Sequence, residues 1–372
     1  MKILIDSQIS AAEEMFGHLG RVELFKGRSL TRESVKRAQV LIVRSVTRVN
    51  KELLDGSQIC FVGSATSGQD HVDVQFLEEN GIEFFSAAGS NAKTVAEHVL
   101  CCIYDYASGT RVGLDELSVG LVGYGNVGRA VGNLLEGLSI RHLAYDPFLS
   151  SHSKLSVLTD LDSVIGCDVV SLHVPLTTNC LHPTRNFIDE HVVSNLRSGS
   201  LLINTARGDV IDEGALIKRV LGGDRIWAAI DCWTGEPNIN ADLARDVWRG
   251  TPHIAGHSVQ AKNRASLMVY QRLCDYLKIQ RRDFKFRVKE PSFLGVEGNF
   301  DVRDILNAVH PLKHHTEEII KISQLDTPRK VAYFDDYRAK CGLRQEFSAY
   351  KAVCSGFDGG IIKTLTGLGF FS

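Results

Sequence analysis

Long apolar runs and an excess of charge of one sign are both missing from this sequence of 372 residues. No stretch approaches the ~20 apolar residues that a membrane-spanning helix needs, so no membrane association is expected. Lysine and arginine total 42 against 44 for aspartate and glutamate, and the net charge of −2 offers no general attraction to nucleic acid. An anionic ligand would therefore have to be bound by local charges.

Paired cysteines are missing as well, since none of the nine stands in a CxxC spacing. Disulfide frameworks and structural zinc sites depend on such spacings, so the cysteines are expected to be reduced thiols in a core. The opening MKILIDSQIS has one lysine and an apolar run too short for a secretory signal, and we expect it to form a strand. These features predict a cytoplasmic protein.

What the sequence does contain is two series of short apolar runs, which are typical of parallel sheets covered by helices. The first series, up to about residue 90, is KILID, VELF, VLIVR, CFVGS and EFFS. The second series follows a predicted buried helix at 94–107 and is SVGLVG, IRHLAYD, DVVSLHV, SLLINT and RIWAAID. The predicted fold class is α/β, with two doubly wound parallel-sheet domains. Beyond about residue 280 the pattern becomes mixed and predicts a small α+β domain.

The most informative motif follows the strand SVGLV, where Gly123, Gly125 and Gly128 have the GxGxxG spacing. A helix with regularly spaced apolar residues comes next, and Asp146 ends the following strand. In such motifs the first glycine permits a tight turn, the second lets a pyrophosphate approach the backbone, and the third lets the helix pack on the strand. The arrangement predicts a dinucleotide site; the alternative is a turn that binds nothing.

Asp146 favours NAD over NADP as the dinucleotide. A carboxylate at this position accepts hydrogen bonds from the ribose diol, and it repels the additional phosphate of NADP. The following segment PFLSSHSK offers only Lys154 to offset that repulsion.

Three polar residues follow successive predicted strands: Arg207 in LLINTARGDVID, Glu236 after AAID and His253 in TPHIAG. A guanidinium can bind a carboxylate or polarise a ketone oxygen. An imidazole of ordinary pKa ~6.5 can accept a hydroxyl proton while hydride leaves the same carbon, and a neighbouring carboxylate would stabilise the imidazolium. Taken singly, His253 could instead be a core histidine and Glu236 a surface residue.

His253 and His257 stand four residues apart, as zinc ligands on a helix do. Pro252 and Gly256 argue against a helix, because the first lacks a backbone donor and the second is a poor helix former. Ile254 also occupies the place where the zinc motif has its glutamate. We therefore predict no metal site here.

Over about residues 1–280 the sequence resembles the D-isomer-specific 2-hydroxyacid dehydrogenase family. The matching motifs are GLVGYGNVGR, SLHVPLTTN, LLINTARGDVID, DCWTGEP and TPHIAG. The resemblance implies that Arg207 binds the substrate carboxylate and carbonyl, that His253 is the acid/base and that Glu236 is its partner. It implies that NAD is bound by residues at successive strand ends: Gly123, Gly125, Asn126, Val127, Gly128, Asp146, Val174, Ala206, Asp231 and Gly256.

The resemblance also implies a chain that crosses twice between two domains. Residues 1–92 and 257–280 would form a flavodoxin-like substrate domain, and a Rossmann NAD domain at 93–256 would be inserted in it. Residues 281–372 would form a C-terminal dimerisation domain, so a homodimer is expected. Closure of the cleft between the two large domains would exclude water.

Several stretches are most similar to one branch of the family, which oxidises 4-phospho-D-erythronate at C2 to 2-oxo-3-hydroxy-4-phosphobutanoate in vitamin B6 synthesis. They are VRSVTRVN, CFVGSATSGQDHVD, SAAGSNA, HPTRNF and the tail YFDDYRAKCGLRQEFSAYKAV. On this likeness Ser45 and Thr66 contact the substrate, and amides of residues 65–68 help to hold its carboxylate. Arg44 is expected at the substrate phosphate. Arg338 or Arg344 of a partner chain would assist it.

The sequence departs from that branch at three positions. His257 stands where the branch has a tyrosine and is expected to contact the substrate in its place. Val174 replaces a threonine beside the cofactor, and Ala88 replaces a proline. His71 and Asp70 could be a second acid/base pair but are expected to fix the shape of a loop. Two alternatives remain open: a dehydrogenase of another phosphorylated acid such as 3-phosphoglycerate, and a non-enzymatic NAD-sensing scaffold that binds proteins.

Overall fold

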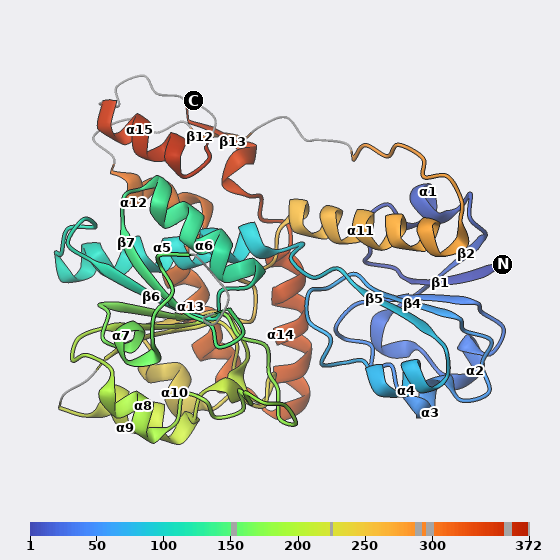
Figure 1. Cartoon of the computed structure of the whole chain (residues 1–372), viewed down its shortest axis with the longest axis horizontal. Coiled ribbons are helices and arrows are strands. Elements are labelled where there is room, and N and C mark those ends of the chain that lie inside the picture. Colours follow the sequence, from blue (N-terminus) through green and yellow to red (C-terminus); the bar gives the residue numbers. More distant parts are fainter. Residues whose placement is uncertain (150–154, 224–225, 287–291, 295–300, 353–358, 371–372) are drawn as a thin grey trace. The chain divides into compact units, whose positions relative to one another are not determined.

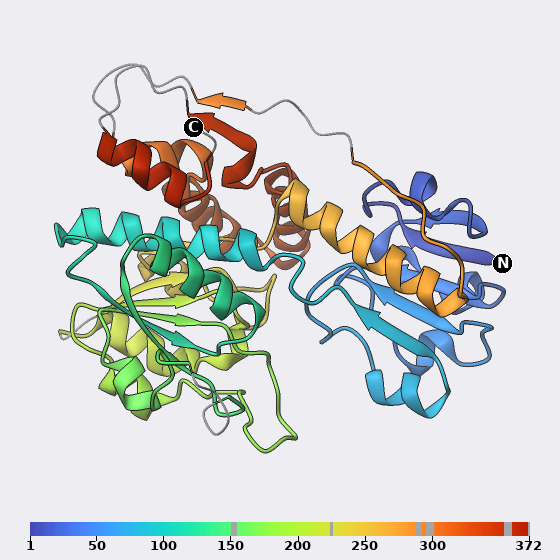
Figure 2. The same ribbon diagram turned by 45° about the horizontal axis from the view of Figure 1, so that its top comes forward.

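The chain folds into two compact units (Figures 1 and 2). The computed structural model describes residues 1–149, 155–223, 226–286, 292–294, 301–352 and 359–370. Unit 1 comprises Met1–Asn91 and Val259–Lys289, and unit 2 comprises Ala92–Ser258 and Glu290–Ser372. The chain therefore leaves unit 1 after Asn91, returns to it after Ser258 and leaves it again near residue 289.

Unit 1 contains a five-stranded parallel sheet. Its strands are β1 (Lys2–Asp6), β2 (Arg21–Phe25), β3 (Val40–Val43), β4 (Phe61–Ser64) and β5 (Glu83–Ser86). They lie in the order β2-β1-β3-β4-β5, which is the flavodoxin-like order. All four residues of β3 and of β4 are buried. A sheet covered on both faces requires such continuous apolar strands.

Helices cover both faces of this sheet. They are α1 (Ala12–Phe16), α2 (Arg32–Val35), α3 (Lys51–Leu54), α4 (Val74–Glu79) and α11 (Val259–Leu277), with a short 3-10 helix η1 (Gly27–Ser29). Residues of α1 and α11 pack with Ile3 and Ile5 on one face, and residues of α2, α3 and α4 pack with Leu4 and Leu41 on the other. The helix α11 is contributed by the segment that returns from unit 2.

Unit 2 contains a six-stranded parallel sheet. Its strands are β6 (Ser118–Val122), β7 (Arg141–Tyr145), β8 (Val169–Leu172), β9 (Leu201–Asn204), β10 (Trp227–Ile230) and β11 (Arg249–Gly250), in the order β11-β10-β9-β8-β6-β7. Beyond β7, Leu158 pairs with Ala144 through a single parallel bridge and takes the place of an outermost strand. The direction of winding reverses between β6 and β8, which is where open α/β sheets bind dinucleotides.

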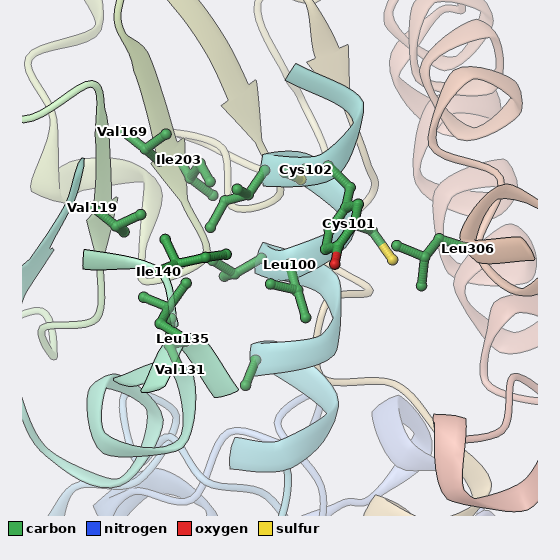
Figure 3. Close-up of a cluster of buried hydrophobic side chains, with 14 of the residues drawn as sticks. Leu100, Cys101, Cys102, Val119, Val131, Leu135, Ile140, Val169, Ile203 and Leu306 are labelled. Carbon is green, nitrogen blue, oxygen red and sulfur yellow. The ribbon is translucent and has the colours of Figure 1, made fainter. Parts of the chain in front are cut away.

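Two groups of helices cover the unit 2 sheet. On one face lie α5 (Ala92–Thr110) and α6 (Asn126–Gly137), and on the other lie α7 (Leu161–Ile165), α8 (Glu190–Asn195), α9 (Glu213–Leu221) and α10 (Ala241–Asp246). The helix predicted at 94–107 falls within α5, whose side chains are buried almost throughout. Figure 3 shows sheet residues such as Ile203 on one side of α5, while Cys101 points toward Leu306 on the other side.

The C-terminal tail belongs to unit 2. It contains α12 (Val302–Val309), α13 (Leu312–Ser323), α14 (Thr327–Cys341), α15 (Gly359–Gly367) and a small parallel pair, β12 (Ser292–Leu294) and β13 (Tyr350–Ala352). Figures 1 and 2 show α12 and α15 on the side of the sheet that carries α5 and α6. Residues Ile319 of α13 and Phe334 of α14 join the core on the other side. Two short 3-10 helices, η2 (Gly208–Val210) and η3 (Phe347–Ala349), complete the unit.

The predicted fold class is confirmed. Each of the ten apolar runs forms a strand, and β11 is an additional strand that is too short to stand out in the sequence. The described cysteines are free thiols. Among the described residues, no helix has both the length and the apolar character needed to cross a bilayer. The tail packs on the unit 2 sheet, and its predicted standing as a separate dimerisation domain stays a prediction.

Candidate active site

His253 and Glu236 form a close pair in unit 2. His253 lies in the non-helical segment 251–258 that follows β11, and Glu236 lies between β10 and α10. Nδ1 of His253 is 2.5 Å from Oε1 of Glu236. The His253 side chain keeps 29% of its exposure, so Glu236 holds one ring nitrogen while part of the ring stays accessible. Nε2 is then the nitrogen that can exchange a proton with a substrate.

The contact determines the charge of both groups. Burial opposes the imidazolium, but adjacent Cys232 and Glu236 favour it, and the pKa of His253 lies well above its usual value. Burial also raises the pKa of the Cys232 thiol, which is therefore neutral, and we assign the counter-charge to Glu236. Burial opposes ionisation of Glu236 as well, yet His253 and Arg338 hold the pKa of its carboxyl below the usual value.

Asp231 holds the backbone around His253. The side chain follows β10 and is 1% exposed. Its Oδ1 accepts hydrogen bonds from Oγ1 of Thr251 (2.6 Å) and from the amides of Ile254 (2.7 Å) and Ala255 (3.1 Å). His253 has a φ of 54°, in the left-handed region that a residue with a side chain keeps only where its surroundings hold it. Asp231 thus acts on His253 through the backbone, and its contact with the cofactor stays a prediction.

Arg207 stands just beyond β9, and Asn204 shapes its loop. Nδ2 of Asn204 donates to the carbonyl oxygens of Arg207 (2.9 Å) and Cys232 (3.3 Å), while Oδ1 accepts from the amide of Ala206 (3.0 Å). Nη1 of Arg207 donates to the Ala206 carbonyl at 2.7 Å. One buried amide therefore ties the loop of the predicted substrate-binding arginine to the end of the next strand.

Gly208 brings two of these loops together. A Cβ atom at this position would lie 2.1 Å from the carbonyl carbon of Trp233 and 2.2 Å from the amide nitrogen of Thr234. Only glycine permits so close an approach of two backbones. The Arg207 loop consequently packs against the segment that leads to Glu236.

The glycine motif has the geometry of a dinucleotide loop. Gly123 has a φ of +90°, and a Cβ at Gly128 would lie 2.1 Å from the carbonyl oxygen of Gly123. A Cβ at Gly125 would meet no atom within 4 Å. The first and third glycines are thus required by the fold, whereas the second leaves open space at the N-terminus of α6, which has no side-chain cap. Amides at such a helix end bind phosphate oxygens.

The other predicted cofactor residues lie around this loop. Asp146 follows β7, and its Oδ2 accepts from the amide of Tyr124 at 2.9 Å. A methyl carbon of Val174 would lie 3.0 Å from a Cβ at Gly123.

The remaining predicted cofactor and substrate residues of unit 2 lie on three segments. Asn126 and Val127 begin α6, Ala206 is buried after β9, and Gly256 and His257 lie in the His253 loop. Lys154, which entered the choice between NAD and NADP, lies outside the described residues.

In unit 1, the predicted substrate residues gather at one edge of the sheet. Arg44 and Ser45 follow β3, and Thr66 follows β4. The two strands pair in parallel with Val43 opposite Ser64, so their carboxyl ends meet at that edge.

The loop after β4 is fixed by hydroxyl and imidazole contacts. Oγ of Ser64 lies 2.8 Å from Oγ1 of Thr66 and 3.1 Å from Nε2 of His71. His71 therefore helps to shape the loop that carries Thr66, which agrees with the role expected for it.

Two cations of unit 1 lie near one another. Nε of Arg44 is 3.1 Å from Oδ1 of Asp6, a fully buried carboxylate at the end of β1. Burial and the positive charge of Arg44 lower the pKa of Lys262 on α11. A dianionic phosphate would relieve the repulsion between them. Lys262 was not predicted, because nothing local in the sequence connects α11 with the end of β3.

The sequence did not single out Asn204, and it suggested another role for Arg344. Asn204 is one of many polar residues at strand ends, and only the tertiary contacts reveal its part. Arg344 was expected to reach a partner chain, but in the structure it binds carbonyl groups of its own chain near His253. Among the described residues, no group of three or more histidine, cysteine, aspartate or glutamate side chains is placed to hold a metal ion.

Known proteins match both the cofactor unit and the whole chain. Residues 102–255 match the family described as D-isomer specific 2-hydroxyacid dehydrogenase, NAD binding domain. The chain is 37% identical over 380 residues to erythronate-4-phosphate dehydrogenase of Teredinibacter turnerae, with 100% of this chain and 98% of that protein covered. The corresponding protein of Hahella chejuensis is 33% identical over 377 residues, with 100% and 99% covered. The chain belongs to the erythronate-4-phosphate dehydrogenase family.

Solved structures share the fold of about three quarters of the chain. The NAD complex of formate dehydrogenase from Staphylococcus aureus has a TM-score of 0.62 and 23% identity, and it covers 74% of this chain and 96% of its own. The NAD⁺ complex of 3-phosphoglycerate dehydrogenase from Entamoeba histolytica has a TM-score of 0.64 and 24% identity, and it covers 77% and 99%. About a quarter of the chain thus has no counterpart in either structure, whereas the erythronate-4-phosphate dehydrogenases match it throughout.

The residues of unit 2 fit NAD. The open space at Gly125, the uncapped start of α6 and the carboxylate of Asp146 after β7 are suited to the pyrophosphate and ribose contacts that this dinucleotide would require. NAD is therefore the cofactor, in agreement with the family description of residues 102–255.

Proposed function

We propose that the protein oxidises 4-phospho-D-erythronate at C2 to 2-oxo-3-hydroxy-4-phosphobutanoate, with NAD, in vitamin B6 synthesis. The observation that carries this proposal is the match to erythronate-4-phosphate dehydrogenases along the whole chain, tail included. The His253–Glu236 pair, in the same unit as the glycine loop, supports an acid/base reaction there.

Arg207 binds and orients the substrate in this proposal. Its planar guanidinium can donate two hydrogen bonds to the C1 carboxylate or share them with the oxygen at C2. The C2 oxygen becomes a ketone during oxidation, and a fixed cation stabilises the negative charge that develops on it. The contacts of Asn204 hold the loop in which this guanidinium stands.

His253 is the base for oxidation. Bound NAD supplies the hydride acceptor for the C2 hydrogen. Nε2 of neutral His253 accepts the proton of the C2 hydroxyl, and the electron pair of that O–H bond forms the carbonyl. Glu236 then stabilises the imidazolium through Nδ1. In the reverse reaction, Nε2 of protonated His253 returns the proton to the oxygen at C2.

We assign the phosphate end of the substrate to unit 1. Arg44 and Lys262 supply positive charge for it, and Ser45 and Thr66, at the same edge of the sheet, supply further contacts with the substrate. We further propose that His257, in unit 2, contacts the substrate. Dianions of this kind are bound most tightly by several cations with additional hydroxyl donors.

We also propose that the protein acts in the cytoplasm as a homodimer. Free cysteine thiols suit a reducing compartment. The exposed apolar side chains of Leu343 and Tyr333 in the tail supply a surface for a second copy.

A substrate comparison tests the reaction. NADH formation is measured separately with 4-phosphoerythronate, 3-phosphoglycerate and unphosphorylated erythronate. A 2-oxo acid is included in parallel assays to regenerate cofactor that does not dissociate. We expect the highest kcat/KM with 4-phosphoerythronate and a large loss without the phosphate. Preference for 3-phosphoglycerate would replace the proposed substrate, and no reaction with any acid would favour a scaffold.

A further inference from the structure

The tail reaches the catalytic loop through Arg344, three residues beyond α14. Nη2 of Arg344 donates to the carbonyl oxygens of Ala255 (2.9 Å) and Thr94 (3.2 Å), and Nε donates to that of His257 (3.2 Å). Two of the three acceptors belong to the loop that carries His253. Charge-assisted bonds to carbonyl groups are worth more than neutral ones, about 1.5–3 kcal/mol each.

Glu346 fixes the neighbouring segments. Its carboxylate is 1% exposed, and Oε1 accepts from Oγ1 of Thr94 at 2.5 Å and from Oγ of Ser258 at 3.4 Å. Thr94 and Ser258 are fully buried, and Oγ1 of Thr94 lies 2.9 Å from Oγ of Ser258. Thr94 stands three residues after Asn91, and Ser258 is the last residue before the chain returns to unit 1. The tail therefore binds both segments of unit 2 that lead to unit 1.

The loop after His253 is held both by its amide groups and by its carbonyl groups. Asp231 accepts from the amides of Ile254 and Ala255, whereas Arg344 donates to the carbonyl of Ala255. The Ala255 peptide groups thus have a charged partner on either side. His253, two residues earlier, has a positive φ, and such a conformation persists only when several contacts determine it.

A cavity lies beside the loop that carries His253, next to the side chain of Arg344. A space of about 180 Å³ is lined by Ile254, His310, Cys341 and Arg344, among others. The loop is therefore not closely packed on this side. The space also means that a smaller or uncharged side chain at position 344 can be accommodated without a clash.

We propose that Arg344 is a positioning residue for catalysis, which holds the carbonyl groups of the 255–257 loop and thereby places His253 for proton transfer. The tail then contributes to the active centre of its own chain, in addition to any part in pairing. The inference depends on the proposed dehydrogenase reaction for its kinetic test. It does not depend on the identity of the hydroxy acid.

The kinetic test compares Arg344→Met and Arg344→Lys with a control, Arg329→Met. Arg329 lies on the same tail and pairs only with Asp326 in the described contacts. We expect Arg344→Met to lower kcat about 10–100-fold, since small misplacements of catalytic groups cost this much, with a smaller change in KM. Arg344→Lys should recover part of the rate because it retains a cationic donor. Arg329→Met should have wild-type kinetics.

Two further readouts separate positioning from general stability. Added guanidinium, below denaturing concentrations, should raise the rate of Arg344→Ala but not of wild type. Thermal unfolding records how far each variant is destabilised. A wild-type kcat and pH profile for Arg344→Met would overturn the proposal, as would an equal loss in Arg329→Met. So would a loss that follows the fall in melting temperature and that neither lysine nor guanidinium restores.

A spectroscopic arm remains informative if no substrate is turned over. The chain is labelled with ¹³C at histidine Cε1, and the His253 resonance is assigned with His253→Asn. We expect Arg344→Met to move this resonance and lower its titration midpoint, because the contact with Glu236 loosens, while Arg329→Met leaves it unchanged. An inactive wild type would refute the proposed function. An unmoved His253 resonance would refute the positioning role independently.

Discussion

In the proposed reaction, proton transfer at the C2 hydroxyl depends on a few residues with unusual surroundings. His253 combines a left-handed backbone with a close carboxylate partner, and neither feature can be read from TPHIAG alone. The sequence indicated which residue types would meet, because Arg207, Glu236 and His253 each follow a predicted strand. It could not indicate that Asn204 and Asp231 would hold the backbone of the loops that carry Arg207 and His253, since many strand ends carry polar residues.

Replacing His253 by glutamine tests the base directly. The amide has a similar size but cannot accept the hydroxyl proton, so kcat for oxidation should fall by ~10²–10⁴. The measurement is NADH formation at saturating substrate. His191→Gln, on the exposed side of α8, is the matched control and should have the wild-type rate. Retention of most of the rate by His253→Gln would remove the imidazole from this role.

Replacing Glu236 by glutamine should change the pH dependence. Oxidation requires neutral His253, so kcat/KM rises as the pH increases through the His253 pKa, which is raised in the wild type. The variant loses the carboxylate that favours the imidazolium, and its pKa should fall. The ascending limb should therefore move to lower pH, with a lower maximum.

The reverse reaction gives the opposite sign for the same variant. Reduction of the 2-oxo acid requires protonated His253, so Glu236→Gln should lose reductive rate at neutral pH more than at acidic pH. An ascending limb of oxidation at the wild-type position would show that Glu236 does not control the imidazole. The two directions together separate a pKa effect from a general loss of activity.

At the scale of elements, the glycine loop separates residues that the fold requires from one that the cofactor requires. A side chain at Gly128 would collide with the Gly123 carbonyl at 2.1 Å, whereas one at Gly125 would meet open space. We expect Gly128→Ala to lose about 1–3 kcal/mol of unfolding free energy. Gly125→Val should keep the wild-type melting temperature but bind NAD at least about tenfold more weakly, which corresponds to ~1.4 kcal/mol.

The comparison is made by thermal unfolding without cofactor and by titration with NADH fluorescence. Gly223→Ala serves as the neutral control, because a Cβ there meets no atom within 4 Å and lies far along the chain from the loop. Tight NAD binding by Gly125→Val would mean that the open space at the start of α6 does not receive the pyrophosphate.

Strands and the buried helix α5 were predictable because their apolar patterns are local. Every run that predicted a strand forms one, and the helix predicted at 94–107 falls within α5. The bridge at Leu158 and the two-residue β11 were not predictable, since neither has an apolar pattern of its own. Both are formed only because the neighbouring sheet offers an edge.

For the whole molecule, the tail was recognised by its sequence, but its packing was not. The change of composition after residue 280 predicts an appended domain. In the structure, the two hydrophobic cores on either face of the unit 2 sheet contain side chains of the tail: Ile319, Phe334 and Phe347. Such long-range contacts join segments more than a hundred residues apart, and no local pattern encodes them.

Pairing of two chains through the tail can be tested at an exposed apolar residue. Leu343 is 75% exposed in the single chain, and a homodimer that covers it would bury a leucine side chain worth about 1.5–3 kcal/mol per copy. Leu343→Glu should therefore weaken the dimer by one to several orders of magnitude in Kd, because a buried carboxylate adds a desolvation cost to the lost apolar contact. Light scattering after size exclusion, over a series of concentrations, measures the shift.

The control is Leu181→Glu, which changes a leucine that is 83% exposed but lies outside the tail, in the predicted NAD domain. This variant should leave the mass unchanged. A monomeric wild type, or equal effects of the two variants, would place the interface elsewhere or remove it.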